Sequence, residues 1–306
     1  MAAAPHNRVL PDPELVRRFA AFPVRSRLPM EGGFAGIHRG LHRGVGIEFS
    51  AYRRYSPGDD VTRVDWRVYG RSDRFYVKES ETESSLVCRI VVDATGSMGY
   101  GSGSRTKLEA ACEVAAVLAA LLVRQGDAVG MLSLGGAPPV DIAPRRAARH
   151  VGIMAAALSA LRPAGDADPA ATIAGLAGRL HRRGLVLVFS DGFCDPEALV
   201  SRLGWLAHRG HDVSLFLVRD PREEDLDFAG TVRFEDLEGG PTTTVEVAAV
   251  GPGYRRRWAA HQERLEAGCA ARGIRVLPLG TTNEPRVILE RFLGGGPQLG
   301  SEGRRA

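Results

Sequence analysis

The sequence lacks the features that mark membrane and secreted proteins. Its longest apolar run, residues 114–123, is about half of the roughly 20 residues that a membrane-spanning helix needs. Residues 1–8 contain no apolar segment of the kind found in secretion signals. We therefore expect a soluble cytoplasmic protein that does not engage a membrane, and we interpret residues 114–123 as part of a buried helix.

Cysteine is scarce, and the sequence offers no common zinc or redox motif. The four cysteines, at 88, 112, 194 and 269, form no Cys-x-x-Cys pair, so neither a zinc knuckle nor a thioredoxin-type site is indicated. The eight histidines include no His-Glu-x-x-His sequence, which zinc proteases use. Scattered cysteines without pairing are consistent with a reducing cytoplasm.

Long blocks of one charge are also missing. The net charge is +4, but no run of like charge exceeds the three arginines at 255–257. Without a basic run or an aromatic platform, the sequence does not indicate nucleic-acid binding.

From residue 85 onward, short apolar runs alternate with helical stretches, which favours a parallel sheet covered by helices on both faces. We therefore predict an α/β, Rossmann-like domain over residues 85–293. It is preceded by an N-terminal extension, residues 1–84, that packs on it, and followed by a disordered tail, residues 294–306. The predicted strands are residues 86–92, 128–134, 185–189, 213–218 and 274–277, with a hairpin at a sheet edge from 231–234 and 242–247; the predicted helices are 13–22, 107–124, 145–161, 170–183, 196–208, 253–272 and 284–293.

Two of the predicted strands end in an aspartate. The first is followed by Asp93-Ala-Thr95-Gly-Ser97, and the strand at 185–189 by Ser190-Asp191-Gly192. Ligands of open α/β sheets bind at the carboxyl ends of strands, and carboxylate and hydroxyl oxygens are suitable ligands for Mg²⁺. A simpler interpretation makes Asp93 and Ser97 helix caps and residues 190–192 a turn. Because both aspartates follow strands, we favour a cation site.

This arrangement resembles the metal-ion-dependent adhesion site of von Willebrand factor A domains, whose motif reads Asp-x-Ser-x-Ser, then Thr, then Asp. Thr95 stands where that motif has its first serine, which keeps the hydroxyl oxygen and adds a methyl group. For the separate threonine we choose Thr172, which lies between the two aspartate motifs. The resemblance implies Mg²⁺ or Mn²⁺ bound by Asp93, Thr95, Ser97, Thr172 and Asp191.

A second resemblance covers nearly the whole chain. The N-terminal part is similar to the signature of the bacterial family called domain of unknown function 58 (DUF58), which precedes a von Willebrand A-like domain. The residues that carry it are Glu48, Arg53, Tyr55, Asp59, Asp60, Arg63, Asp65, Trp66 and Arg71. From their residue types alone, these arginines and aspartates indicate either a structural network of ion pairs, which we favour, or a partner-binding surface. Genes of this family typically lie beside a MoxR-type AAA+ ATPase, which implies such an ATPase as a partner.

The sequence is consistent with two functions, one a binding module and the other an enzyme. The favoured one is a protein-binding module without catalytic residues, in which the cation accepts an acidic side chain of a partner such as the ATPase or its client. The alternative is a metal-dependent phosphatase with Asp93 as the nucleophile. Such an enzyme needs a carboxylate two residues later as general acid, where this chain has Thr95.

Overall fold

The computed structural model describes most of the chain. The described residues are 9–28, 49–55, 66–72, 74–80, 86–166, 168–177, 180 and 183–294. Glu48, Asp59, Asp60, Arg63 and Asp65 of the signature lie outside them, as do residues 295–306, so the predicted disordered tail stays a prediction.

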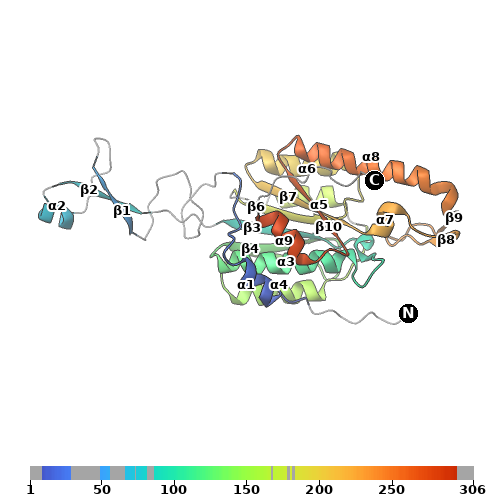
Figure 1. Cartoon of the computed structure of the whole chain (residues 1–306), viewed down its shortest axis with the longest axis horizontal. Coiled ribbons are helices and arrows are strands. Elements are labelled where there is room, and N and C mark those ends of the chain that lie inside the picture. The colour runs from blue at the N-terminus through green and yellow to red at the C-terminus, as the bar shows by residue number, and fades with distance from the viewer. Residues whose placement is uncertain are drawn as a thin grey trace, which may run out of the picture.

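A six-stranded sheet forms the centre of the molecule (Figure 1). Its order is β10-β7-β6-β3-β4-β5, and only the edge pair β4–β5 is antiparallel. The strands are β3 Val87–Asp93, β4 Ala128–Leu134, β5 Asp141–Arg145, β6 Leu185–Ser190, β7 Asp212–Arg219 and β10 Arg275–Gly280. The predicted fold class, a mostly parallel α/β sheet with an N-terminal extension, is confirmed.

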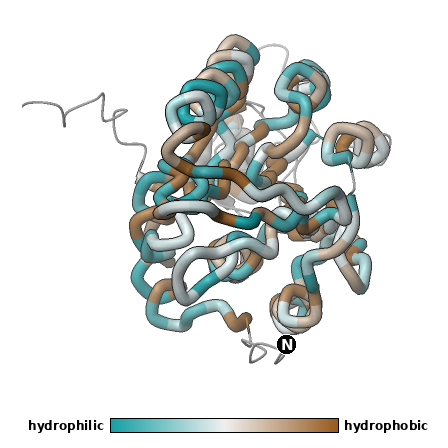
Figure 2. Tube along the Cα trace, turned by 90° about the vertical axis from the view of Figure 1, so that its right-hand side faces the viewer, coloured by the Kyte–Doolittle hydropathy of each residue, from teal (hydrophilic) through white to brown (hydrophobic). Residues whose placement is uncertain are grey.

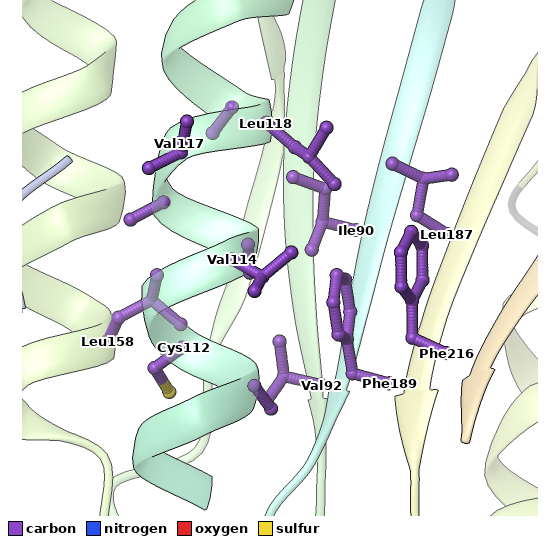
Figure 3. Close-up of a cluster of buried hydrophobic side chains, with 14 of the residues drawn as sticks. Ile90, Val92, Cys112, Val114, Val117, Leu118, Leu158, Leu187, Phe189 and Phe216 are labelled. Carbon is purple, nitrogen blue, oxygen red and sulfur yellow. The ribbon is translucent and has the colours of Figure 1, made fainter. Parts of the chain in front are cut away.

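Helices cover both faces of this sheet, because its strands are apolar on both sides. Ile90 and Val92 of β3 point toward α3 (Figure 3), whereas Val91 packs with the helices of the opposite face. On the first face lie α1 Pro13–Phe19, α3 Lys107–Arg124, α4 Arg149–Ala160 and α9 Pro285–Leu293; on the second lie α5 Pro169–Ala177, α6 Pro196–His208 and α8 Val247–Ala270.

Within the central sheet and its helices, the sequence patterns missed one strand and placed one helix start late. β5 shows alternating partial and full exposure and contains Pro144, features of an edge strand without an apolar run. Helix α8 begins at Val247 and continues through Pro252, although a proline inside a helix removes one backbone hydrogen bond, so the predicted start at residue 253 was too late.

Residues 9–28 pack along the domain as a strap. Val9, Phe19 and Val24 are buried in the core beside α3 and α4. At its end, Arg27 donates from Nε and Nη2 to Oδ1 of Asp212, the buried first residue of β7, at 3.0 and 2.6 Å. The strap therefore ends at the amino-terminal edge of the sheet.

The other described residues of the N-terminal extension form a small unit with a separate two-stranded sheet. β1 Phe49–Arg54 and β2 Tyr76–Ser80 make an antiparallel two-stranded sheet, with α2 Trp66–Ser72 between them in sequence. In Figure 1 this unit lies at the opposite end of the molecule from β8 Thr231–Phe234 and β9 Thr243–Glu246. We call β1, α2 and β2 the N-terminal hairpin unit.

Strands β8 and β9 form the predicted hairpin, but not at the edge of the central sheet. They make a separate two-stranded antiparallel sheet, preceded by a short helix, α7 Pro221–Asp225, that the sequence did not predict. Figure 2 views the molecule from this end. Among the described residues, no helix combines the length and apolar character required to cross a bilayer.

Candidate functional site

The two aspartates singled out in the sequence meet at the carboxyl edge of the sheet. Asp93 is the last residue of β3, and Asp191 directly follows β6. These strands are parallel neighbours, so their carboxyl ends lie side by side, as expected for a ligand site in an open α/β sheet. Both side chains are buried, with 1% and 3% of their surface exposed.

Hydroxyl groups surround the carboxylate of Asp93. Its Oδ1 accepts hydrogen bonds from the backbone N and the Oγ1 of Thr95, at 3.0 and 2.8 Å. Its Oδ2 accepts from Ser190 Oγ at 2.6 Å. Thr95 Oγ1 in turn lies 3.1 Å from Ser97 Oγ. The structure thus brings together Asp93, Thr95 and Ser97, in the alternating pattern that the sequence suggested.

The helix-cap interpretation of this segment is wrong in one respect. The residues after Asp93 form a short 3-10 helix, η2 Gly96–Gly99, whose N-cap is Thr95 and whose cap makes no side-chain hydrogen bond. Asp93 instead accepts hydrogen bonds from Thr95, two residues later, and from Ser190 of β6.

Burial and like charge leave Asp93 poorly neutralised. Desolvation raises the pKa of Asp93, the nearby charge of Asp191 raises it further, and the hydrogen bonds from Ser190 and Thr95 offset this only in part, so the pKa is about 6. A positive charge at this place would relieve the repulsion between the two carboxylates.

A buried lysine, which the sequence patterns missed, holds the other aspartate. Lys107 is fully buried, and its Nζ lies 2.8 Å from Asp191 Oδ2 and 2.8 Å from Glu223 Oε1. The ammonium also lies 4.5 Å from the ring centroid of Phe193. Lys107 is the first residue of the mostly apolar helix α3, behind a Thr106–Glu109 capping box, which marks the helix start but not the partners of the lysine.

Glu223 brings a third carboxyl group to this cluster, from helix α7. Burial raises the pKa of Glu223 to about 7, although the charge and hydrogen bond of Lys107 act to lower it. Oε2 of Glu223 is buried and has no hydrogen-bond partner among the described residues. Lys107 therefore pairs with two carboxyl groups, those of Asp191 and Glu223, while Asp93 lies close enough to Asp191 for their charges to repel, so the cluster can hold more negative charge than Lys107 neutralises.

A third strand-end carboxylate, Asp220, which follows β7, has a structural role instead. Burial alone would raise the pKa of Asp220, but hydrogen bonds from Ser102, Thr281 and Arg222 outweigh it and lower the pKa below its ordinary value. These bonds join the ends of β7 and β10 to the loop before α3. Asp220 is thus fully engaged within the protein.

Thr172, the fifth predicted ligand, does not share hydrogen bonds with the other four in the described part of the chain. It sits in α5, where its hydroxyl donates to the carbonyl of Asp168 at 3.2 Å. Within the described part of the chain, its side chain makes no hydrogen bond to Asp93, Thr95, Ser97 or Asp191. Its role as a ligand stays a prediction.

The oxygen atoms at this edge are suited to a hard divalent cation. The 3.1 Å between Thr95 Oγ1 and Ser97 Oγ is a hydrogen-bond distance and also about the 3 Å that separates adjacent ligands of octahedral Mg²⁺. Among the described residues, no group of three or more His, Cys, Asp and Glu side chains is arranged around one point. A cation here would therefore depend on the two hydroxyls as well as on Asp93 and Asp191.

The described residues of the signature lie in the N-terminal hairpin unit. Arg53 is in β1, and Trp66 and Arg71 are in α2. Tyr55 packs against Phe75, and Trp66 meets the same ring edge-on, at centroid distances of 6.3 Å each. Since the acidic residues of the signature are outside the described residues, the proposed network of ion pairs stays a prediction.

Comparisons with known proteins agree with the resemblance seen in the sequence. Residues 51–264 match the family model described as "Protein of unknown function DUF58". Uncharacterised proteins of Mycobacterium bovis and Mycobacterium tuberculosis are 29% identical over 286 residues, which cover 92% of this chain and 90% of each relative.

Two solved structures also align with the chain. One is the conserved hypothetical protein BatB from Bacteroides thetaiotaomicron, at 17% identity and a TM-score of 0.44 over 69% of this chain and 98% of that one. The other is an aerotolerance-related membrane protein from Bacteroides fragilis, at 16% identity and a TM-score of 0.45 over 69% and 100%.

Proposed function

The chain belongs to the DUF58 family of proteins of unknown function, and from this premise we propose that it is a divalent-cation-dependent protein-binding module. Asp93, Thr95, Ser97 and Asp191 would hold Mg²⁺ or Mn²⁺ at the carboxyl edge of the sheet. The bound cation would supply a positive charge that attracts a carboxylate of a partner protein. The chain itself carries out no bond-breaking step.

One observation carries this proposal: two buried carboxylates and two hydroxyls converge at the ends of β3 and β6. Burial places this cluster in a region of lower effective dielectric than water, where the attraction between a cation and a carboxylate is stronger. Hydroxyl ligands add no charge of their own, so a cation held in this way keeps much of its attraction for an external acid.

The rest of the cluster is better suited to binding than to phosphate chemistry. The alternative phosphatase requires a general acid two residues after Asp93, where Thr95 stands, and a lysine that contacts phosphate. Lys107 contacts Asp191, but the lysine is fully buried and its ammonium is paired with both Asp191 and Glu223. An ammonium already committed to two carboxylates is a poor phosphate ligand.

The partner that we propose is a MoxR-type AAA+ ATPase, or a client of that ATPase, in the cytoplasm. This step rests on the typical gene neighbourhood of the family and on the acidic chemistry that a cation site selects. The chain would then act as an adaptor between the two.

Calorimetric titration with MgCl₂ tests the cation site directly. We expect one weak site in the wild-type protein and its loss in Asp93→Ala, with the fold retained by circular dichroism. An assay with a generic aryl phosphate and Mg²⁺ tests the alternative, and turnover that disappears in Asp93→Ala would favour the phosphatase.

A further inference from the structure

The tip of the β8–β9 hairpin lies directly on the motif loop. Oε1 of Glu238 accepts a hydrogen bond from the backbone N of Ser97 at 3.3 Å. A Cβ atom added to Gly96 would overlap the carbonyl oxygen of Leu237. The hairpin backbone therefore approaches the loop as closely as a glycine allows, and it brings a carboxylate to the residue that carries the Ser97 hydroxyl.

The hairpin presents Glu238 in a defined geometry. Asp236 Oδ1 accepts a hydrogen bond from the backbone N of Glu238 at 2.8 Å, and Gly239 continues the turn with a φ of +94°, a conformation that favours glycine. Below the turn, β8 and β9 pair from Phe234–Thr243 to Thr231–Glu246. The turn is thus built to direct one acidic side chain toward η2.

The same tip is weakly anchored. Residues 235–244 are all exposed, and Leu237 keeps 52% of its surface accessible. A segment with so little buried surface can leave its place at low cost in free energy. Glu238 can therefore occupy the site without being fixed there.

We propose that Glu238 is an intrachain carboxylate ligand of the candidate cation site, which holds the hairpin tip over that site. This inference rests on the proposed cation binding. Glu238 would join Asp93 and Asp191 only when the cation is bound, since the three carboxylates are not grouped around one point among the described residues. It would bind on the solvent side, where the carboxylate of a partner would also arrive. The chain's own acid and an external acid would then compete for one position.

The test compares Glu238→Gln with Glu235→Gln, a matched variant in the same hairpin whose side chain pairs with Arg233 instead. Both residues are exposed, so neither change threatens the fold. Calorimetry with MgCl₂ should show affinity reduced by about fivefold or more in Glu238→Gln, as expected for loss of one nearby charge. Affinity should be unchanged in Glu235→Gln.

Hydrogen exchange of the hairpin tip gives a second readout. In the wild type and in Glu235→Gln, Mg²⁺ should slow amide exchange in residues 235–240, and in Glu238→Gln it should not. Gly96→Ala, whose Cβ would overlap the backbone of Leu237, should displace the tip and so remove its protection by Mg²⁺, as Glu238→Gln does.

Two results separate the possible failures. If Mg²⁺ binds wild type and Glu238→Gln equally and leaves the tip's exchange unchanged, Glu238 is not a ligand, and the cation site stands without it. If Mg²⁺ binds none of the variants or the wild type, both this inference and the proposed function are overturned.

Discussion

The two ends of the central sheet are built in different ways. At the carboxyl edge, the candidate site joins residues distant in sequence, because β3 and β6 place Asp93 beside Asp191. At the amino-terminal ends of the strands, the strap ends where Arg27 pairs with Asp212. The chain re-enters the central domain at Leu86, whose backbone N donates a hydrogen bond to Asp127. Between these two points in the sequence lies the N-terminal hairpin unit, whose strands, among the described residues, pair only with each other.

The chemistry of the two ends differs as much as their construction. The carboxyl edge collects buried charges, whereas the N-terminal hairpin unit collects aromatic rings. Tyr69 and Phe75 stack at 4.4 Å, and Trp66 and Phe75 keep 58% and 45% of their surface exposed. The described residues of the family signature therefore lie away from the candidate cation site, and the two regions can be tested separately.

The largest expected difference concerns cation binding. Asp93→Asn should abolish measurable Mg²⁺ binding, because it removes the buried carboxylate that faces Asp191. The same change should stabilise the cation-free protein by about 1 to 2 kcal/mol, since it removes a charge that burial disfavours. Calorimetry and denaturant unfolding measure the two effects. Asp227→Asn, at an exposed aspartate, is the control, and equal binding by all three proteins would remove Asp93 from the site.

Lys107 tests whether the carboxyl edge depends on an internal cation. Lys107→Met should cost about 3 to 5 kcal/mol of unfolding free energy, because it leaves Asp191 and Glu223 buried without their partner. Mg²⁺ should recover more stability in this variant than in the wild type. Glu223→Gln is the matched change, and we expect a smaller loss, since burial already favours the neutral form of that carboxyl group. A Lys107→Met protein as stable as wild type would contradict the account of this cluster.

The pKa of Asp93 predicts a pH dependence for the carboxyl edge alone. The folded pKa of about 6 lies above the ordinary 3.8, so the folded state binds this proton more tightly than the unfolded state does. The contribution of Asp93 to stability therefore falls as pH rises from about 4 to 6, and it stays unfavourable above 6. Mg²⁺ should raise the melting temperature more at pH 7.5 than at pH 5. An equal shift at both values, measured by differential scanning fluorimetry, would show that Asp93 does not compete between proton and cation.

The smallest effect is expected in the N-terminal hairpin unit. Trp66→Ala should change the unfolding free energy of the central domain by less than about 1 kcal/mol, because the side chain is mostly exposed. It should leave Mg²⁺ binding unchanged. Phe216→Ala, which removes a buried ring stacked on Phe189 (Figure 3), should cost about 3 to 5 kcal/mol in the same denaturant titration. A large loss in Trp66→Ala would show that the N-terminal hairpin unit is coupled to the core.

Much of the fold was readable in the sequence because its signals are local. Strand β6 is apolar over residues 185–189 and buried on both faces, and such runs identify parallel strands. The same reasoning places Asp93 and Asp191 at strand ends. It failed for β5 and α7, which are short and mostly exposed.

The partners of the site could not be predicted in the same way. Lys107 reaches Asp191 and Glu223 only after α3 and α7 have packed at the end of the sheet, and no spacing in the sequence encodes that meeting. Glu238 meets Ser97 across 141 residues. Thr172 was chosen by its order in the chain, and order does not determine which face of α5 it occupies.

The central claim is that the carboxyl edge captures a partner by means of a cation. Its most direct test is recovery of the MoxR-type ATPase from native lysate on the immobilised full-length protein, with Mg²⁺, with EDTA, and with Asp93→Asn in the presence of Mg²⁺. The account predicts recovery in the first condition and loss in the other two, with Trp66→Ala behaving as wild type. Equal recovery in all three conditions, together with loss in Trp66→Ala, would contradict it and move the contact to the N-terminal hairpin unit.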